Sequence, residues 1–237
     1  MKKILFVTAS FIFISVHAQT VDEIIQKYNT TLGGLDAFKA IKSAKITGNV
    51  SVQGNDLPLT VQIINGRAVR SDVEFMGQSI TNSFKDGKGW KVNPLAGVNT
   101  PTDVDGTELA DLKSQSSMAS PLMDYKDHGN QVELEGQEDV EGIKTYKIKL
   151  TNKDDGKVTT YFISTTDNTL IKSVGSREIQ GQELEIETFY SDIKDFNGLK
   201  FAMTRTQKIE GQVFQEVKYT SIEFNVPIVE KVFDKPE

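Results

Sequence analysis

Three glutamates on one predicted strand come nearest to a catalytic pattern. Glu183, Glu185 and Glu187 alternate with Leu184 and Ile186, and because side chains alternate along a strand, the three carboxylates share one face. Two carboxyl groups that flank a glycosidic bond can act as nucleophile and acid, but a retaining pair needs a separation of roughly 5 Å. On a regular strand Glu183 and Glu187 lie about 13 Å apart at Cα. The pattern therefore favours the solvated outer face of a sheet over a glycosidase site.

A second acidic group suggests a calcium loop but fails its spacing. Asp103 and Asp105 stand beside Gly106, and a calcium loop has a glycine at its sixth position between acidic ligands at its first and last positions. With Gly106 sixth, Pro101 is first and Leu112 is twelfth, and neither side chain can bind a metal. We expect no metal site here.

The remaining residue types also point away from catalysis. The sequence has no cysteine and two histidines. His128 could titrate near neutral pH, but no serine stands in a strand-to-helix elbow to use it. The run 87–89 contains two glycines but precedes Trp90 on a predicted strand, so it does not resemble a phosphate-binding turn before a helix. We expect a binding protein rather than an enzyme, with no cofactor.

The first 18 residues have the pattern of an export signal. Lys2 and Lys3 form a basic start, residues 4–16 are largely apolar, and residues 16–18 form a small-residue cleavage site. The mature protein is predicted to begin at Gln19. Because the chain has no cysteine, the mature N-terminus cannot be lipidated through a thioether as bacterial surface lipoproteins are.

The charge and hydropathy of the mature chain limit its partners. Without Lys2 and Lys3 the chain keeps 25 basic and 33 acidic residues, a net charge of −8, which argues against nucleic acid or an anionic membrane as a partner. No second long apolar run follows, so stable membrane insertion is not expected. Residues 19–237 have the length of one all-β domain, and we expect a single domain.

The mature chain is predicted to open with two helices. Thr20 and Glu23 have the spacing of a capping box before a helix over Val21 to Leu32. Apolar residues recur there at intervals of three and four, which predicts one buried stripe. Glycines at 33 and 34 end this helix, and a short second helix is predicted from Asp36 to about Ile41.

Beyond the helices the hydrophobic period changes to two, which predicts half-buried strands. We expect about eleven, one starting at Ala44 and the others over 57–63, 69–75, 80–84, 132–135, 146–150, 158–163, 170–174, 184–189, 199–209 and 213–224. Short glycine-containing turns separate most of them, so neighbouring strands should pair antiparallel. The predicted fold class is mainly β with a few helices, an antiparallel barrel closed or nearly closed on itself.

Residues 94–124, the lid segment, break the strand pattern. The segment contains three prolines and a predicted helix that starts near Thr107, and it is too long for a hairpin. Its apolar residues are enough for one buried face, and flexible methionines suit a surface that accepts variable apolar shapes. They are Leu109, Leu112, Met118, Leu122 and Met123. The sequence leaves open whether the segment is a lid over a cavity or a plug at one barrel end.

Three motifs together carry a family resemblance. Residues 84–94 read FKDGKGWKVNP, which resembles the hairpin that precedes the lid in bacterial lipoprotein-sorting carriers of the LolA/LolB-like superfamily. The turn at 65–67, which leads to Arg70, and the closing FDKP at 233–236 are similar to features of the same family. The resemblance spans nearly all of the mature chain.

The resemblance implies a soluble periplasmic carrier with an incompletely closed antiparallel barrel, covered by an N-terminal helix and a helical lid. Its apolar cavity would shelter acyl chains of lipoproteins or similar lipids, taken from an inner-membrane donor and passed to an outer-membrane acceptor, and the carrier would act as a monomer. A basic residue near the end of the third strand latches the lid in this family. Arg67 or Arg70 would hold that place.

The residues expected at the cavity follow from the resemblance and from the apolar pattern. We place Trp90, Leu109, Leu112, Met118, Leu122 and Met123 near the mouth, and Phe75 and Ile80 on the wall. Two other functions remain open at this stage. One is a sensor or scaffold of the same fold that recognises a lipoprotein or another protein, and the other is a secreted glycoside hydrolase that uses Glu183 and Glu187.

Overall fold

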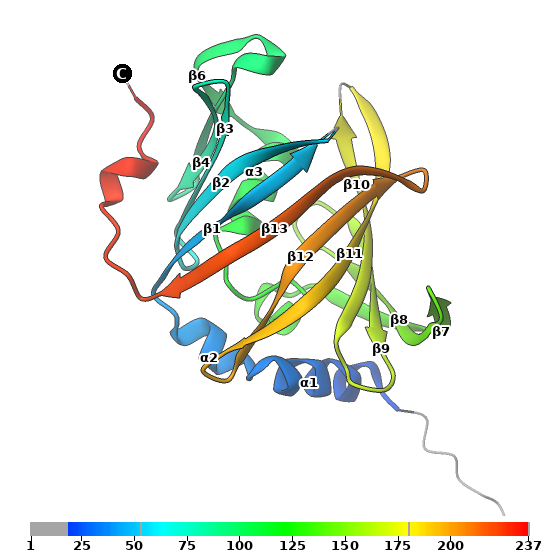
Figure 1. Ribbon diagram of the computed structural model, residues 1–237. Coiled ribbons are helices and arrows are strands. Elements are labelled where there is room, and N and C mark those ends of the chain that lie inside the picture. The colour runs from blue at the N-terminus through cyan, green and yellow to red at the C-terminus, as the bar shows by residue number, and fades with distance from the viewer. Residues whose placement is uncertain (1–18, 53, 180, 237) are drawn as a thin grey trace, which may run out of the picture.

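The computed structural model describes residues 19–52, 54–179 and 181–236, drawn as a ribbon in Figure 1. The predicted export signal, residues 1–18, lies outside the described residues. Across the part of the chain that is described, none of the helices has the length and apolar character that crossing a bilayer would require.

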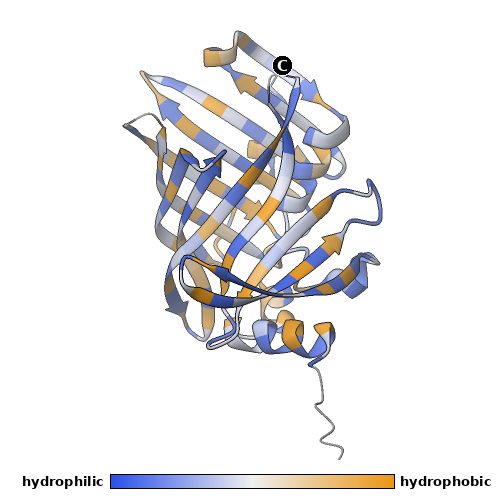
Figure 2. Ribbon diagram, turned by 90° about the vertical axis from the view of Figure 1, so that its right-hand side faces the viewer, coloured by the Kyte–Doolittle hydropathy of each residue, from blue (hydrophilic) through white to orange (hydrophobic). Residues whose placement is uncertain are grey.

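Thirteen strands among the described residues form one sheet. They are β1 (Ser43–Val52), β2 (Asn55–Ile64), β3 (Ala68–Phe75), β4 (Gln78–Lys85), β5 (Lys88–Asn93), β6 (Val98–Val104), β7 (Gln131–Val140), β8 (Ile143–Thr151), β9 (Val158–Ser164), β10 (Leu170–Ile179), β11 (Gln182–Phe196), β12 (Leu199–Ile209) and β13 (Gln212–Phe224). Every pair is antiparallel. Figure 2 shows polar and apolar residues alternating along many of these strands, as expected of a sheet with one face toward a core.

The strand order explains why the barrel stays open. It runs β6-β5-β4-β3-β2-β1-β13-β12-β11-β10-β9-β8-β7, so β1 and β13 form the central seam and β6 and β7 lie at the two edges. In the described chain no ladder joins these edges. Because β6 and β7 are consecutive in sequence, residues 105–130, the crossing segment, must travel from one edge of the sheet to the other.

Four helices and two short 3-10 turns complete the described structure. They are α1 (Val21–Leu32), α2 (Leu35–Ala40), α3 (Gly106–Gln115), α4 (Tyr125–His128), η1 (Pro94–Ala96) and η2 (Glu230–Phe233). Figure 1 shows α1 and α2 across one end of the barrel and α3 within its curve. The predicted capping box of α1 is present, because the Thr20 hydroxyl accepts from the Glu23 amide and the Glu23 carboxylate accepts from the Thr20 amide.

Two hydrophobic clusters lie on the concave side of the sheet. The first joins α1 and the end of the crossing segment to β8 and β9, with Ile24, Leu122 and Ile163 at its centre. The second joins α3 to β1–β4, with Leu112 and Phe84 among its buried members. Met118 packs against both clusters. The crossing segment therefore packs against both halves of the sheet.

The predicted fold class is confirmed, with two strands more than the eleven expected. These are β5 and β6. β5 contains Trp90, which is expected on a strand, but its six residues are not among the eleven predicted ranges. β6 occupies 98–104 within the predicted lid segment. The sequence pattern does not predict this strand, because it carries Pro101 and mostly exposed residues. Proline is tolerated on an edge strand, where a missing amide costs no ladder bond. The helical part of the lid segment begins at Gly106, close to the predicted Thr107.

Gly48 should be indispensable to the β1–β13 seam. A Cβ at this position would lie 2.2 Å from the Lys218 carbonyl oxygen and 2.9 Å from the Tyr219 Cα, which are backbone atoms that cannot rotate away. We expect Gly48→Ala to lower the free energy of unfolding by about 1–3 kcal/mol, the usual cost of overpacking. Urea titration measures this change.

Gly175→Ala is the matched control, because Gly175 also lies inside a strand and the nearest atom to its added Cβ, the Thr159 Oγ1, is 3.5 Å away. We expect a change below about 1 kcal/mol there. Equal losses in the two variants would contradict the close approach at the seam.

Candidate functional site

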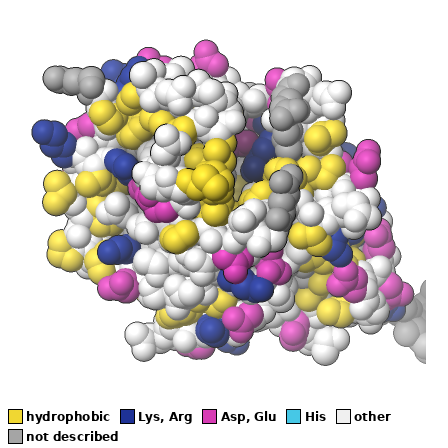
Figure 3. Space-filling view, turned by 45° about the horizontal axis from the view of Figure 1, so that its top comes forward, with side chains coloured by type: hydrophobic (Ala, Val, Ile, Leu, Met, Phe, Trp, Pro, Cys, Tyr) yellow, Lys and Arg dark blue, Asp and Glu magenta, His cyan; other side chains and the backbone are white. Residues whose placement is uncertain are grey.

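A cavity of about 370 Å³ lies between the concave face of the sheet and the helices. This volume falls within the roughly 300–1,000 Å³ of small-molecule sites. Strands on both sides of the seam line it, together with α1, α2, the end of α3 and residues 117–123. Seen from the end opposite α1 and α2, the surface is hollowed between hydrophobic side chains, and a basic side chain is visible inside the hollow (Figure 3).

Most of the cavity wall is apolar. The β1–β3 wall presents Ile46, Val61, Ile63 and Val69, which alternate with outward side chains as the strand pleat requires. On the opposite side Phe201 stacks at 5.1 Å between ring centroids with Phe38 of α2. The crossing segment closes the cavity with its own apolar side chains, among them Met118 and Met123. Such a lining suits a hydrocarbon ligand.

Hydroxyl groups form the polar part of the lining. Ser114, Ser117 and Ser120 come from the crossing segment. Across the cavity the Ser173 hydroxyl and the Tyr190 phenol form a hydrogen bond of 3.0 Å. Burial raises the pKa of Tyr28 to about 12, against the opposing effect of its hydrogen bond with Ser120. Tyr28 is therefore neutral at physiological pH and acts as an uncharged hydrogen-bonding group.

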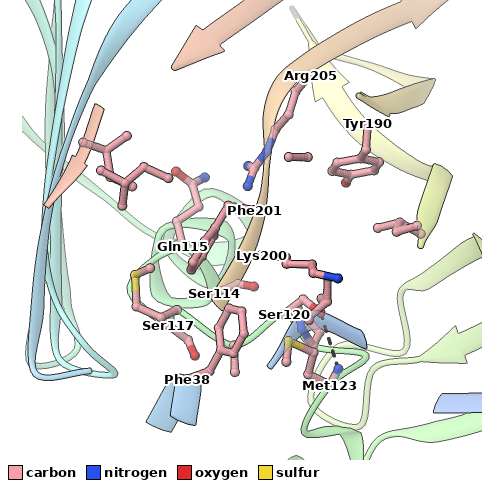
Figure 4. Close-up of a pocket in the computed structure, with 18 of the residues that line it drawn as sticks. Phe38, Ser114, Gln115, Ser117, Ser120, Met123, Tyr190, Lys200, Phe201 and Arg205 are labelled. Carbon is pink, nitrogen blue, oxygen red and sulfur yellow. Dashed lines mark hydrogen bonds between the residues drawn. The ribbon is translucent and has the colours of Figure 1, made fainter. Parts of the chain in front are cut away.

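Arg205 projects into the cavity from β12 (Figure 4). Its side chain lines the cavity and remains exposed. Its guanidinium carbon lies 5.8 Å from the Tyr190 ring centroid and 5.4 Å from that of Tyr219. The phenol of Tyr219 raises the pKa of Arg205, and loss of solvent opposes the effect. The guanidinium therefore stays charged.

Sequence reasoning missed Arg205, although the signal was present. Within the predicted strand 199–209, Phe201, Met203 and Arg205 share one register, and Met203 is buried. A charged residue in step with two core residues marks a position where a charge points inward. Among the described residues, none supplies a carboxylate within ion-pair distance of this guanidinium.

Asn65 holds the crossing segment in place. Its side-chain amide donates to the carbonyl oxygens of Phe38 and Ile41, and its side-chain oxygen accepts from the Met118 amide at 2.9 Å. The neighbouring Gly66 amide donates to the Ser116 carbonyl at 2.8 Å. One turn at the end of β2 thus ties α2 to residues 116–118.

Of the predicted cavity residues, the structure brings four to the concave core. Met118 and Met123 line the cavity itself. Leu112 and Leu122 are buried in the two hydrophobic clusters beside it. Leu109 packs against the second cluster and also lines a separate hollow near the β4–β5 turn. Their role in ligand binding remains a prediction.

The other three predicted residues lie away from the cavity lining. Trp90 lies on the outer face, where its Nε1 donates to the Phe233 carbonyl at 2.8 Å and η2 covers it. Phe75 and Ile80 flank the β3–β4 turn and do not line the cavity. The hairpin that carries the family resemblance therefore holds the C-terminal segment in this chain.

Both candidate latch arginines also bind the C-terminal segment. Arg67 pairs with Asp86 at 3.0 Å and with Glu230 at 2.9 Å. Arg70 pairs with Asp72 at 2.8 Å and donates to the Val232 carbonyl at 2.7 Å. Arg70 alternates with Val69, which lines the cavity, so its side chain points to the outer face. In the described chain neither arginine bonds to the crossing segment, whereas Asn65 and Asn29 both hold its backbone, Asn29 by donating to the Met123 carbonyl at 2.9 Å.

The acidic groups have structural partners. Glu187 pairs with Lys172 at 3.0 Å, and Glu183 accepts a hydrogen bond from Ser176. The β10–β11 register is continuous over 182–189, so the strand has no bend that could bring Glu183 and Glu187 together. Asp103 pairs with Lys235 at 2.9 Å. The described residues contain no group of three or more acidic or histidine side chains that could hold a metal ion.

The second hollow is less suited to a ligand. It has a volume of about 730 Å³ and lies between the β4–β5 turn and residues 233–235. Two of its three lysines pair with neighbouring carboxylates, since Lys85 pairs with Asp234 at 2.8 Å and Lys235 pairs with Asp103. The cavity on the concave face is therefore the candidate site.

The fold and the cavity define a class of protein. The chain is an open antiparallel barrel whose two edges are bridged by a helical segment over an apolar cavity, and a solved LolA superfamily protein has a similar fold. No family model matches the sequence, and no curated protein matches it.

Three solved structures have a similar fold. A LolA superfamily protein from Nitrosomonas europaea aligns with a TM-score of 0.59 at 13% identity, over 92% of this chain and 99% of that one. A putative outer membrane lipoprotein-sorting protein domain from Vibrio parahaemolyticus gives 0.58 at 11% identity, over 90% and 95%. A DUF1329 family protein from Desulfovibrio piger gives 0.58 at 12% identity, over 90% and 97%. At these identities the likeness concerns the fold.

Removing the Asn65 side chain should release the crossing segment. Asn65→Ala leaves the Met118 amide and two carbonyl groups without their partner, and we expect a loss of about 1–3 kcal/mol in the free energy of unfolding. Hydrogen exchange at residues 116–124 should become faster than in the unmodified protein, because the tie that holds this segment is gone.

Asn99→Ala is the control, since the exposed Asn99 side chain makes only a local bond of 3.4 Å to the Gly97 carbonyl. We expect a change within about 0.5 kcal/mol for this variant. Unchanged exchange at 116–124 in Asn65→Ala would show that other contacts fix the segment.

Proposed function

We propose that this protein is a soluble periplasmic carrier that binds acyl chains of lipoproteins or similar lipids noncovalently and passes them toward the outer membrane. The observation that carries the proposal is the largely apolar cavity of about 370 Å³ between the concave face and the crossing segment. The fold shared with a LolA superfamily protein and with a lipoprotein-sorting protein domain supports it.

The energetics of lipid transfer favour such a cavity. Each buried methylene contributes about 0.8 kcal/mol, so an acyl chain in water needs an apolar shelter. A carrier must also release its cargo, and a lining that fits too tightly would prevent this. Met118 and Met123, whose unbranched side chains adapt to irregular shapes, lie on the movable side of the cavity. The apolar cavity wall and the methionines of the crossing segment thus suit both uptake and release of an acyl chain.

The crossing segment can act as a lid. It is tied through the Asn65 turn and through buried side chains such as Leu122, while serines make up much of its cavity side. Opening would expose the cavity without breaking any strand pairing, because the segment belongs to no ladder. The periplasmic location rests on the predicted signal at residues 1–18 and would place the carrier between a donor in the inner membrane and an acceptor in the outer membrane.

Native mass spectrometry of detergent-free protein tests the proposal directly. We expect copurified lipid, or binding of the neutral fluorescent probe N-phenyl-1-naphthylamine with displacement by lipids. Ser71→Phe should weaken probe binding by about tenfold or more, equivalent to about 1.4 kcal/mol. Ser71 lines the cavity from β3, and the added ring would fill the space that a ligand needs.

Ser79→Phe is the matched control because Ser79 lies on β4 opposite Glu74, on the face that points away from the cavity. Binding should be unchanged in this variant. If neither lipid nor probe binds the folded protein, or if both variants bind alike, the carrier proposal is wrong.

A further inference from the structure

The cavity carries a charge that an acyl chain alone would not need. Resting on the proposed carrier function, we propose that the ligand is an amphiphile with an anionic headgroup, a carboxylate or a phosphate, which pairs with Arg205 while its tail lies under the crossing segment. The headgroup chemistry follows from the charges, the geometry and the pairing pattern of the arginines.

The cavity lining is cationic in an acidic protein. The full sequence has a formal net charge of −6, yet none of the described residues that line the cavity is an aspartate or a glutamate. Two lining residues, Lys200 and Arg205, are cations. Acidic residues outnumber basic residues in the sequence as a whole. The cavity lining has the opposite charge, and a positively charged lining attracts an anion.

Among the described residues, Arg205 differs from the other three arginines of the sequence in having no carboxylate partner. Arg67 and Arg70 form ion pairs on the outer face, and Arg177 lies 3.8 Å from Asp111. For Arg205 the described residues supply only the rings of Tyr190 and Tyr219. A guanidinium that lines the cavity and has no carboxylate beside it can pair with an anionic ligand.

The surroundings of Arg205 suit a headgroup with several acceptor oxygens. Arg205 and Tyr190 are direct cross-strand partners on β12 and β11, and the Tyr190 phenol already meets the Ser173 hydroxyl. A guanidinium can donate two parallel hydrogen bonds to a carboxylate or a phosphate, while the neighbouring hydroxyls can donate to a further oxygen. The two aromatic rings hold the guanidinium between them and fix its direction.

The two ends of the cavity differ in the groups they offer. Figure 4 shows Arg205 and Tyr190 on one side of the space, and Phe38 and Met123 on the other together with Lys200 and the serines of the crossing segment. An amphiphile can therefore place its head at Arg205 and its tail against Phe38 and the methionines. A neutral acyl chain would leave the guanidinium unpaired.

Competition among ligands with the same tail tests this assignment. Dodecanoate, dodecyl phosphate, 1-dodecanol and dodecyltrimethylammonium, each below its critical micelle concentration, compete against N-phenyl-1-naphthylamine in wild type and in Arg205→Met. We expect the two anions to compete at least about tenfold better than 1-dodecanol in wild type, and the cation to compete worst. Arg205→Met should abolish the difference between anions and alcohol while the neutral probe still binds, because the methionine keeps length and loses charge.

Two further variants test whether the preference for anions comes from Arg205 or from a positive charge elsewhere on the protein. Arg205→Lys should keep part of the anion preference, since an ammonium attracts anions but lacks the planar fork. Lys218→Met removes a positive charge from an exposed side chain on the neighbouring strand, and the preference should persist. A stronger effect of dodecyl phosphate than of dodecanoate would indicate a phospholipid-type head, and the reverse a fatty acid.

The outcomes distinguish this inference from the carrier proposal. If all four ligands displace the probe equally and Arg205→Met binds them as wild type does, the anion site is wrong and the carrier stands. If the preference for anions survives in Arg205→Met but is lost in Lys218→Met, the charge that attracts the anion is not that of Arg205, and the anion site is wrong. If the probe and all ligands fail to bind wild type, the carrier proposal itself fails.

Discussion

The structure depends on one topological constraint, the placing of two consecutive strands at opposite edges of a single sheet. β6 and β7 follow each other along the chain, yet the whole width of the sheet separates them. The chain must therefore leave one edge, pass over the concave face and reach the other edge. A sheet that could pair these edges would close on itself into a complete barrel. Here the intervening residues occupy the interior, and the space they fail to fill is the cavity.

The same constraint divides the molecule into a fixed part and an adjustable part. The sheet is continuous from β6 to β7 and is held by twelve antiparallel ladders among the described strands. The crossing segment contributes no ladder, and it is held by buried side chains and by the Asn65 turn. Motion there costs side-chain contacts but no strand pairing. Low local stability is commonly found in such elements, which open for ligands.

Much of this architecture could be predicted from residue patterns. The capped helix over Val21–Leu32 and most strands follow from periodicity and turn residues, and the structure confirms them. β6 could not be recognised, because an edge strand with Pro101 and mostly exposed residues lacks the alternation that a half-buried strand shows. For the cavity the pattern identified Met118 and Met123 as lining residues, since they stand among apolar residues of a polar segment.

Other parts of the site are harder to predict, because residue type alone does not say which face of a strand looks inward. Trp90 is predicted near the mouth, yet its indole points outward to the Phe233 carbonyl. Arg205 is the opposite case, since its charge suggests a surface position while its register with Met203 directs it inward. Both cases turn on the two-residue period of a strand, in which a shift of one position exchanges the two faces. The faces become certain only when the partners of each strand are known.

The seam between β1 and β13 has a consequence for how the molecule is made. It pairs residues 44–51 with residues 216–224, so the middle of the sheet joins segments from near the two ends of the sequence. Ladders of such long sequence separation form late, because a large loop must close before any hydrogen bond rewards it. During synthesis the early strands remain without their central neighbour until almost the last residue has emerged. The sheet is therefore complete only after its last strand is available, and because the sequence has no cysteine, no disulfide takes part in closing it.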